Sequence, residues 1–372
     1  MIMQQERVIA VHLLNDFSGS PLVLQQVLQI AQQQKQVHLF TATPSGTGLL
    51  SNIEGVIYHP VFYRWHTRKG LTLLFYIWAQ ITLFARLLLF LRRGDVVYIN
   101  TLLPFGAALA AACRRCRIIY HVHEVSIQPR LLKQILAAIA GATAHTLVFV
   151  SEYVKQQFVF PAYKTQVIYN ALPHSFTQPA LQMQHNNTQL PFTVLMLCSL
   201  KKYKGVHQFV QVARQMPYIH FVLVLNATAA ETAAFCHAAN VPVNCSVFPV
   251  QSHPLPFYQR AHVVVNFSLP DSWVETFGMT ILEGMYCGLP AIVPPVGGVT
   301  ELVQNGEQGM HADARDTYCL IRAIELLAGS DSLYTAMATA ARKRALQFTQ
   351  QRFSNAVQQL LNAPAAAKWA HA

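Results

Sequence analysis

Apolar runs and helical stretches alternate along the first half of the chain. Each run is short and rich in β-branched and aromatic residues, whereas the stretches between the runs space their apolar residues as a helix does. The predicted strands are RVIAVHLL, QVHLFTAT, DVVYINT, RIIYHVHE, HTLVFVS and TQVIYN. The predicted helices lie near 20–34, 70–92, 104–115, 129–141 and 151–158. Continuous apolar strands separated by helices indicate a parallel sheet that is covered on both faces.

The same alternation begins again after a polar interval at 172–190 that contains proline, glutamine and asparagine. The predicted strands are FTVLMLCS, HFVLVLN, CSVFPV, HVVVNFS and AIVPP, and the predicted helices lie near 204–216, 228–239, 254–261, 280–287 and 299–304. We therefore predict an α/β protein of two Rossmann-like, doubly wound domains that face each other across a cleft. A ligand should bind there, at the carboxyl ends of the strands.

Three segments follow from this pattern. The first domain is predicted at 1–175 and the second at 176–347. A C-terminal helix and tail are predicted at 348–372, with the hypothesis that this segment crosses back to the first domain.

One segment, Leu71 to Leu91, is long and apolar enough to span a membrane. On a helical wheel, however, its polar residues gather on one side, although Leu83 and Phe90 interrupt that stripe. The polar residues are Thr72, Tyr76, Gln80, Thr82, Arg86 and Arg93. We interpret the segment as an amphipathic helix of a protein that does not span the membrane, and leave open whether its apolar face is buried or meets lipid. The flanking Arg64, Arg68, Lys69, Arg92 and Arg93 favour contact with anionic headgroups.

Composition and charge restrict the classes of partner and the cellular compartment that the protein can have. Apolar residues make up 53% of the 372 residues and charged residues 12%, which excludes disorder, and the net charge of +11 indicates an anionic partner. Nucleic acid is disfavoured because the chain has no zinc-finger spacing, no RNP-like strand and no basic helix with interleaved aromatics. Seven cysteines without framework spacing indicate reduced thiols, and the N-terminus MIMQQER has no signal-peptide pattern. We predict a cytoplasmic protein at the inner face of the cell membrane.

An isolated C-x-x-C pair, Cys113 and Cys116, is the only such spacing in the sequence. The arginines beside it are typical of a solvated helix end, so neither a metal site nor a redox site is predicted there.

The stretch DSWVETFGMTILEGMYCGLP holds two glutamates, Glu275 and Glu283, in a chain that has few carboxylates. Four interpretations compete: a helix cap, a general acid/base pair, metal ligands, and groups that bind hydroxyls beside an anion. Thr280 and Glu283 fit the T-x-x-E capping box, so local pattern favours the cap. Backbone amides of Gly278, Met279 and Thr280 would face an anion at the start of the helix.

Further features of the second half indicate a diphosphate site. Gly297 and Gly298 allow another close backbone approach before a helix, and Lys201 and Lys204 supply positive charge. No aspartate pair of the D-x-D type accompanies them, so we expect no metal ion and no cofactor.

At this point the sequence resembles the retaining glycosyltransferases of the GT-B fold, in particular glycosyltransferase family 4. That family's signature has two glutamates with seven residues between them, an F-G after the first and a G-G before the next helix. Here these are Glu275, Phe277-Gly278, Glu283 and Gly297-Gly298. A K-G at Lys204-Gly205 and the strand YHVHE, which places a histidine at His123, extend the resemblance over nearly the whole chain.

The resemblance implies that the domain at 1–175 takes the acceptor side and that the domain at 176–347 binds the nucleotide sugar. It also implies a role for each matching residue. Glu283 would bind the ribose hydroxyls of the nucleotide, and Glu275 would hold hydroxyls of the donor sugar. The amides from Phe277 to Thr280 would support the sugar and the diphosphate. Lys204 would neutralise the leaving diphosphate, and His123 would lie near the donor sugar. His121 lies on the same face of an extended strand, so the two histidines are easily confused.

Two positions depart from the family pattern. Ser199 stands where an arginine is usual, five residues before Lys204, and Lys201 is our candidate for the missing charge. Gly19 and Ser20 stand where two glycines are common, although their amides can still bind a phosphate or an attacking hydroxyl.

We therefore expect a retaining glycosyltransferase that moves a sugar from a nucleotide-diphosphate donor to a glycan or lipid-linked acceptor. The expected setting is the synthesis of cell-envelope polysaccharide or lipopolysaccharide. Three alternatives stay open: a GT-B nucleotide-sugar 2-epimerase, a non-catalytic GT-B-like partner subunit, and a basic nucleic-acid binder. Only the net positive charge favours the last of these.

Overall fold

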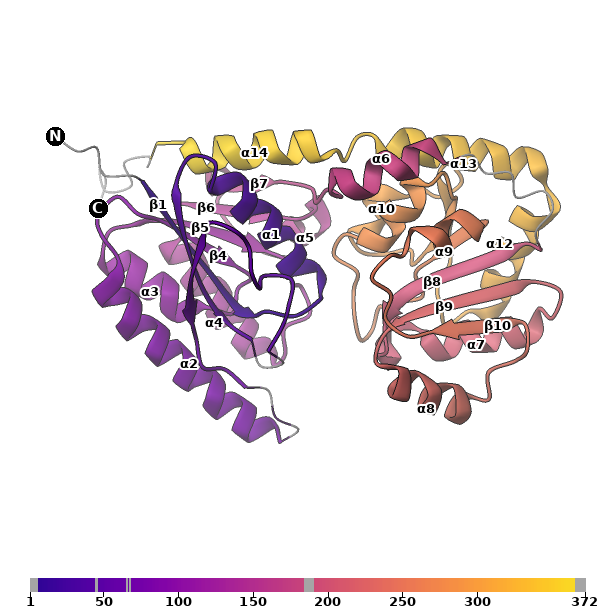
Figure 1. Ribbon diagram of the computed structural model, residues 1–372, viewed down its shortest axis with the longest axis horizontal. Helices are drawn as coiled ribbons and strands as arrows, with labels where there is room; N and C mark the ends of the chain where they lie inside the picture. Colours follow the sequence, from indigo (N-terminus) through magenta and orange to yellow (C-terminus); the bar gives the residue numbers. More distant parts are fainter. Residues whose placement is uncertain (1–5, 44–45, 65, 67, 184–190, 365–372) are drawn as a thin grey trace. The chain divides into compact units, whose positions relative to one another are not determined.

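The computed structural model describes residues 6–43, 46–64, 66, 68–183 and 191–364. It contains two compact units, Met1–Asn170 with Gln351–Ala372, and Ala171–Gln350 (Figure 1). From the sequence, the first domain is predicted to end at residue 175 and the second at residue 347. The predicted cleft between the domains stays a prediction.

The first unit is built around a seven-stranded parallel sheet with the order β3-β2-β1-β4-β5-β6-β7. Its strands are β1 (Arg7–Leu14), β2 (Gln36–Ala42), β3 (Val56–Pro60), β4 (Val96–Asn100), β5 (Arg117–Val122), β6 (Thr146–Phe149) and β7 (Thr165–Val167). Its helices are α1 (Gly19–Ala31), α2 (Lys69–Phe90), α3 (Phe105–Cys113), α4 (Arg130–Thr143), α5 (Glu152–Gln156) and α14 (Gln350–Asn362), with a short 3₁₀ turn at Ala162–Lys164. The central strands β1, β4 and β5 are buried along almost their whole length, as the apolar runs predicted.

Helix α14 belongs to the first unit except for its first residue. The guanidinium of Arg117, at the start of β5, donates hydrogen bonds to the carbonyl oxygens of Leu360 (2.5 Å) and Leu361 (3.1 Å). These carbonyls lie in the last turn of the helix, where no intrahelical donor is available. The side chain of Arg117 therefore caps the end of α14.

The second unit has a six-stranded parallel sheet with the order β10-β9-β8-β11-β12-β13. Its strands are β8 (Thr193–Ser199), β9 (His220–Asn226), β10 (Cys245–Phe248), β11 (Val263–Val265), β12 (Ala291–Val293) and β13 (Gly309–His311). Its helices are α6 (His174–Gln182), α7 (Val206–Gln215), α8 (Ala229–Ala239), α9 (Leu255–Arg260), α10 (Met279–Tyr286), α11 (Val299–Leu302), α12 (Thr317–Gly329) and α13 (Asp331–Ala345), with a 3₁₀ turn at Lys202–Lys204.

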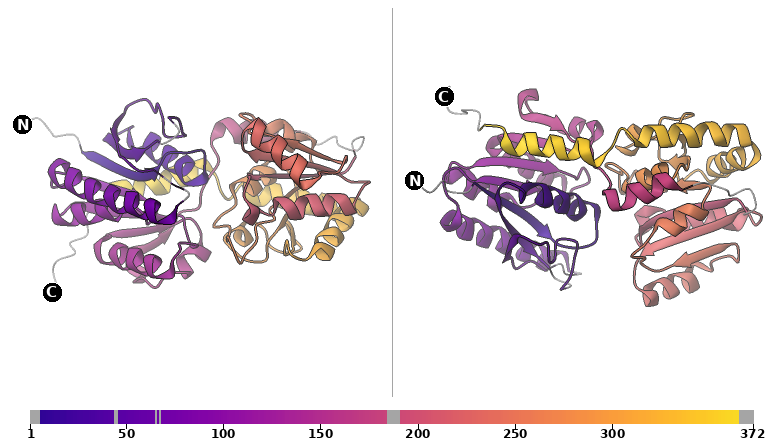
Figure 2. Two further views of the ribbon diagram at one scale, coloured as in Figure 1. Left: turned by 90° about the horizontal axis from the view of Figure 1, so that it is seen from below. Right: turned by 45° about the horizontal axis from the view of Figure 1, so that its top comes forward.

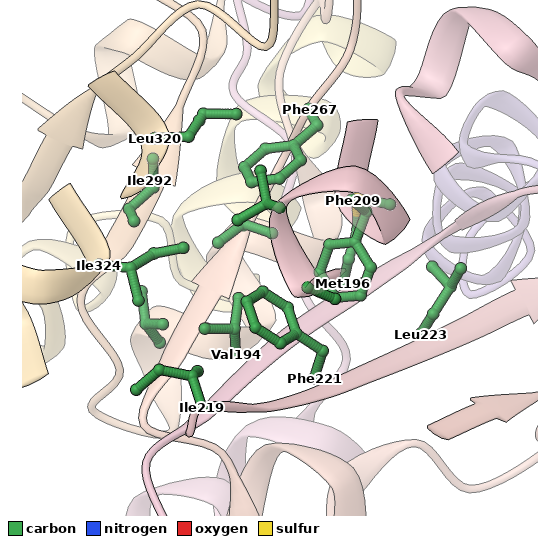
Figure 3. Packing of buried hydrophobic residues seen from close by; sticks show 14 of the residues in the cluster. Val194, Met196, Phe209, Ile219, Phe221, Leu223, Phe267, Ile292, Leu320 and Ile324 are labelled. Carbon is green, nitrogen blue, oxygen red and sulfur yellow. The ribbon is translucent and has the colours of Figure 1, made fainter. Parts of the chain in front are cut away.

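A core of aromatic and branched side chains holds the second sheet to its helices. Phe209 of α7 packs edge-on against Phe221 of β9, with ring centroids 5.3 Å apart, and also meets Phe267 (Figure 3). Leu320 and Ile324 of α12 close the same cluster. This packing buries the apolar face of each amphipathic helix. It also fixes α7, whose first turn lies beside the candidate site.

Each sheet has one point where the strand order reverses, between β1 and β4 in the first unit and between β8 and β11 in the second. In doubly wound sheets, ligands bind outside the carboxyl ends of the strands at these points. Residues 15–20 and 101–104 lie there in the first unit, and residues 199–205 and 266–278 in the second. Nearly all the predicted site residues fall in or beside these segments.

Candidate functional site

An ion pair lies at the strand-order reversal of the second unit. The ammonium of Lys204 is 2.8 Å from Oε2 of Glu275, and the amide of Asn266 donates to the same oxygen at 3.2 Å. Both charged side chains are only 18% exposed. Burial alone would raise the pKa of Glu275, but the charge of Lys204 and these hydrogen bonds outweigh it, so the pKa lies below its usual value. Glu275 is therefore an ionised, positioned acceptor of hydrogen bonds.

Aromatic side chains support the cation of this pair. The Lys204 ammonium lies 5.2 Å from the ring centroid of Trp273, and Trp273 stacks on Tyr203 with centroids 5.2 Å apart. A cation over an indole face is held by the quadrupole of the ring. The two rings thus restrict where the Lys204 side chain can point.

Gly205 follows Lys204 because no other residue fits. Its φ of +76° is left-handed, and a Cβ there would lie 2.1 Å from the carbonyl oxygen of Phe267. The turn that carries Lys204 is also tied to the loop after β11 by the amide of Leu269, which donates to the carbonyl of Tyr203 at 2.8 Å. The close approach at Gly205 thus holds Lys204 against the loop that carries Glu275.

Gly205→Ala should lower the free energy of unfolding by about 2–5 kcal/mol, from the left-handed backbone and the clash together. Gly329→Ala is the matched control, because Gly329 has ordinary φ and open space around its Cβ position. Thermal or denaturant unfolding of both variants measures the difference, and equal stabilities would contradict the close-approach explanation.

Gly297 and Gly298 brace Glu275 through the backbone. A Cβ on Gly297, whose φ is +111°, would lie 2.4 Å from the carbonyl oxygen of Glu275. The amide of Gly298 donates to that same oxygen at 2.8 Å. In the structure the glycine pair therefore brings a second loop against the Glu275 backbone.

The predicted capping box at Thr280 and Glu283 is wrong. Helix α10 begins at Met279 with Gly278 as its N-cap, in the left-handed conformation (φ 100°) and without a side-chain cap hydrogen bond. Thr280 is therefore already helical, and Glu283 lies in the second turn. Because a left-handed glycine starts the helix, the first-turn amides keep no side-chain partner from the cap and are available to an anion.

Phe277 contributes packing and backbone rather than a side-chain contact to a ligand. Its ring is 2% exposed and meets Phe348 edge-on at 5.8 Å. A Cβ on Gly278 would lie 2.9 Å from Cγ2 of Val299, so the start of α10 is packed against α11. That the backbone amides from Phe277 to Thr280 bind a ligand stays a prediction.

Glu283 has a specific partner that sequence did not indicate. The hydroxyl of Tyr258, a fully buried residue of α9, lies 2.5 Å from Oε2 of Glu283. Burial raises the pKa of Glu283 to about 7, although the Tyr258 hydrogen bond works in the opposite direction. The carboxyl group is thus held in one orientation and titrates near neutral pH.

The structure places the two lysines before Lys204 on the surface. Ser199 ends β8, and its carbonyl accepts the amide of Lys201 at 2.7 Å. Lys201 is exposed, and its charge contributes to a lowered pKa of Glu231, after the hydrogen bonds from Thr228 that lower it most. Lys202 is exposed as well. That Lys201 replaces the missing arginine stays a prediction.

His123 and His121, which sequence could not separate, have different surroundings. His121 is fully buried, and its Nδ1 lies 2.6 Å from the hydroxyl of Tyr98. His123 follows β5, and its Nε2 lies 2.9 Å from Oδ1 of Asn100. Asn100 donates its amide to the carbonyl of Ser20 at 3.1 Å, which turns Oδ1 toward the imidazole. The Nε2 of His123 is therefore the protonated nitrogen, and its Nδ1 carries the lone pair that can accept a hydrogen bond.

Burial and two neighbouring histidines hold the pKa of His123 well below its usual range, so its ring is neutral. Gly19 begins α1 beside this network, with no atom within 4 Å of its Cβ position. The predicted roles of Gly19 and Ser20 as anion-binding amides stay predictions.

Glu124 is a candidate that sequence analysis missed. Its Oε2 accepts hydrogen bonds from the backbone amides of His123 (3.2 Å) and Leu102 (3.4 Å). Its Oε1 is buried and has no hydrogen-bond partner among the described residues. Burial raises the pKa of Glu124 to about 7. Thr101, which also bonds to this carboxyl group, has a φ of +79°, and such strain in a β-branched residue is typical of functional sites.

No group of three or more metal-ligating side chains occurs among the residues that the structure describes. In the second unit, Lys204 lies in the loop that follows β8 and supplies a positive charge beside Glu275. The expectation of a reaction without metal stays a prediction.

Comparison with known proteins agrees with this architecture. Residues 178–344 match the family described as glycosyl transferases group 1, and residues 22–176 match Glycosyltransferase Family 4. Together the two matches cover most of the chain and both of its Rossmann-like units. The chain belongs to the GT-B glycosyltransferases of family 4/group 1. The family domains and the glycosyltransferase names of the relatives support a glycosyltransferase.

Solved structures share the whole fold of this glycosyltransferase at low sequence identity. Anabaena HepE in complex with UDP and glucose has a TM-score of 0.75 and 17% identity, covering 97% of this chain and 100% of that one. WaaG, a glycosyltransferase involved in lipopolysaccharide biosynthesis, has a TM-score of 0.70 and 13% identity, covering 96% and 100%.

Curated relatives match only in part. N-acetyl-alpha-D-glucosaminyl L-malate synthase of Bacillus anthracis is 43% identical over 54 residues, which are 14% of each chain. D-inositol 3-phosphate glycosyltransferase of Corynebacterium diphtheriae is 35% identical over 92 residues, 25% of this chain and 21% of that one. The matched segments of the curated relatives span no more than about a fifth of their length.

Proposed function

We propose that this protein transfers a sugar from a nucleotide-diphosphate sugar to a glycan or lipid-linked acceptor, with retention of configuration at the transferred carbon. The setting that we propose is cell-envelope polysaccharide or lipopolysaccharide synthesis at the cytoplasmic face of the membrane. The observation that carries the proposal is the partly buried Lys204–Glu275 pair in the loop before α10, whose N-cap makes no side-chain hydrogen bond.

The chemistry of this site fits a sugar nucleotide along its length. Glu283, with a carboxyl group oriented by Tyr258, would accept hydrogen bonds from two ribose hydroxyls. The amides of Met279 and Thr280 would bind the diphosphate at the start of α10. Glu275, ionised and fixed by three partners, would accept hydrogen bonds from donor-sugar hydroxyls. A glycosidase pair is less consistent with this geometry, because Glu275 is already neutralised by Lys204.

Lys204 would carry the electrostatic part of the reaction. As the bond between the sugar and the diphosphate breaks, negative charge grows on the leaving phosphate oxygen. An ammonium held in a partly buried site stabilises that charge without reorganisation. The structural neighbours support the donor class, since HepE was solved with UDP and with UDP-glucose.

A panel of sugar nucleotides, screened by thermal shift and then by turnover with and without acceptor, tests the proposal. A donor at about a hundred times its dissociation constant should stabilise the protein by ~2.7 kcal/mol. Transfer to an acceptor supports the proposal. Epimerised nucleotide sugar without acceptor would identify a 2-epimerase, and binding without any turnover would identify a non-catalytic subunit.

On the acceptor side, we propose that Glu124 binds the attacking hydroxyl through Oε1, which has no hydrogen-bond partner in the described part of the chain. Glu124→Gln should raise the acceptor KM or lower kcat by about tenfold, ~1.4 kcal/mol, and leave donor affinity unchanged. Glutamine keeps an oxygen for the amides of His123 and Leu102, so the fold of the loop should persist. Steady-state kinetics over pH checks this. Loss of donor affinity, or kinetics like the wild type, would contradict it.

A further inference from the structure

Helix α2 is apolar on its outer face as well as on its inner face, where Ala79, Leu83 and Leu87 are buried. Large apolar side chains point into solvent along its whole length. These are Leu73, Leu74, Ile77, Trp78, Ile81 and Leu89, which we call the outer α2 stripe. Five of them are between 45% and 60% exposed, and Leu89 is 89% exposed. Soluble proteins rarely expose a continuous row of this kind without a partner.

The inner face of α2 carries two buried polar side chains, Tyr76 and Gln80, whose hydrogen bonds fix the helix. The hydroxyl of Tyr76 donates to the carbonyl of Leu103 at 2.7 Å, and Oε1 of Gln80 accepts the amide of Gly106 at 3.0 Å. A Cβ on Gly106 would lie 2.2 Å from the carbonyl oxygen of Gln80, so α2 and α3 touch through their backbones. The helix therefore cannot rotate to bury the stripe without breaking these contacts.

The surroundings of the stripe suit an anionic membrane surface. Arg64 and Arg68 precede the helix, and Arg92 and Arg93 follow it, all of them exposed. Residues 62–94 contain no acidic residue. Arg86 does not interrupt the stripe, because its guanidinium donates to the carbonyl of Pro60 and lies over the ring of Phe40. An apolar row with basic residues at both ends matches the acyl and phosphate layers of an anionic bilayer.

A transmembrane orientation does not fit these contacts. Helix α2 is long and apolar enough to cross a bilayer, and 28% of its most apolar window is buried. However, its inner face is bonded to α3, and α3 packs on α4 (Figures 1 and 2). Crossing would expose Tyr76 and Gln80 to hydrocarbon and separate the helix from the sheet. The helix is instead built to lie along the surface.

We propose that the outer α2 stripe inserts into the surface of an anionic bilayer and that the acceptor is an amphiphile presented from that bilayer. The second step rests on the proposed transferase function. The structural reason for this second step is that a single turn of α2 has side chains on both the outer and the inner face of the helix. Ile77 and Trp78 point outward, while Tyr76 bonds to Leu103, next to the amide of Leu102 that holds Glu124. A lipid-linked acceptor at the membrane would therefore lie close to the candidate acceptor carboxyl.

Vesicle flotation of the full chain tests the docking step. We expect binding to vesicles of phosphatidylcholine with phosphatidylglycerol, weaker binding to phosphatidylcholine alone, and only partial release by high salt, because insertion of apolar side chains is not screened. Ile77→Ser/Trp78→Ser should reduce binding at least tenfold. Val159→Ser/Val243→Ser, at two fully exposed valines elsewhere, is the matched control and should bind as the wild type does.

Two outcomes would overturn the docking step. The Ile77/Trp78 variant could float like the wild type. Alternatively, the wild type could be a dimer that becomes monomeric in this variant and does not bind vesicles, in which case a second copy covers the stripe.

Activity of the same variants tests the acceptor class. With a lipid-linked acceptor in vesicles, the Ile77/Trp78 variant should lose most of its transfer rate, whereas its sugar-nucleotide thermal shift and its rate on a soluble acceptor analogue should stay unchanged. Equal loss on both acceptors would overturn the acceptor step. Stripe-dependent flotation of a protein that transfers no sugar at all would leave the docking step standing and contradict the proposed function.

Discussion

Lys204→Met should lower turnover by at least a hundredfold, about 2.7 kcal/mol of transition-state stabilisation. Two contacts fix the position of its ammonium, which lies 2.8 Å from Oε2 of Glu275 and over the ring of Trp273. Methionine keeps much of the packing volume while removing the charge. The diphosphate would then leave into a site whose remaining charged group, Glu275, repels it.

The loss should appear in kcat more strongly than in donor affinity, because the charge on the leaving phosphate grows only as the bond breaks. Lys202→Met is the control, since Lys202 is exposed in the same 3₁₀ turn and has no contact with Glu275 among the described interactions. Single-turnover rates and donor titration separate the two effects. Turnover within threefold of the wild type would show that Lys204 does not face the diphosphate.

Removing Lys204 also leaves Glu275 partly buried without its ion pair, which costs stability independently of catalysis. Glu275→Gln in the Lys204→Met background relieves that cost and so identifies it. Alone, Glu275→Gln should lower turnover through the lost hydroxyl contact while nucleotide affinity stays close to the wild type. A change in nucleotide affinity as large as that of Lys204→Met would contradict separate roles for the two residues.

Much of the fold could be predicted because its strands are buried on both faces. Runs such as those of β1, β4 and β9 are continuous in valine, isoleucine and leucine, and only a covered parallel strand needs that composition. Edge strand β3 was missed because its pattern is weaker, with Ile57 and Tyr58 exposed and Pro60 at its end. Strand β13, three residues long, and helices α12 and α13 were not identified either.

Helix α6 lies in the interval that sequence predicted to be a linker. It contains few large apolar side chains, has a proline within it, and buries only two residues, Thr177 and Ala180. Such a helix is stabilised by its packing on α10 rather than by an apolar stripe. Local pattern cannot reveal an element whose stability comes from a distant one.

The candidate site likewise contains residues that could be identified from the sequence and residues that could not. Lys204 and Glu275 were identified from motif spacing, and the structure joins them in one ion pair. The partners Asn266, Tyr258 and Glu124 were missed, because their roles depend on contacts between separate strands and helices. The capping box failed for a local reason: Gly278 takes the N-cap position two residues before Thr280.

The orientation of α2 shows a further limit. Helical periodicity establishes that Tyr76 and Gln80 share a face, but not whether that face is inside. The backbone contact at Gly106, together with the hydrogen bond that Gln80 accepts there, turns the face of Tyr76 and Gln80 inward.

Donor affinity should fall about a hundredfold between pH 8 and pH 5 if Glu283 binds the ribose. Burial raises the pKa of Glu283 to about 7 in the free protein, so its carboxyl group is ionised at pH 8 and mostly protonated at pH 5. Two ribose hydroxyls need a carboxylate that accepts both hydrogen bonds. Below pH 7 the proton must leave before the donor binds, which approaches a tenfold loss of affinity for each pH unit.

Stability of the free protein should change in the opposite sense through the same group. The folded-state pKa of Glu283 lies above its ordinary value of 4.5, so the folded chain binds more protons than the unfolded chain between pH 4.5 and 7. The contribution of Glu283 to stability is therefore fully present below pH 4.5 and is lost as the pH rises through 7. Donor binding should offset this loss at high pH.

Glu283→Gln removes the titration and separates it from every other group. Its donor affinity should be low and almost independent of pH between 5 and 8. Isothermal titration with an intact sugar nucleotide is the suitable measurement, because its two phosphates are both esterified and do not titrate in this range. Tyr258→Phe, which removes the hydroxyl beside Oε2, should raise the pKa further and move the loss of affinity to higher pH. A pH dependence that survives unchanged in Glu283→Gln would show that another group binds the ribose.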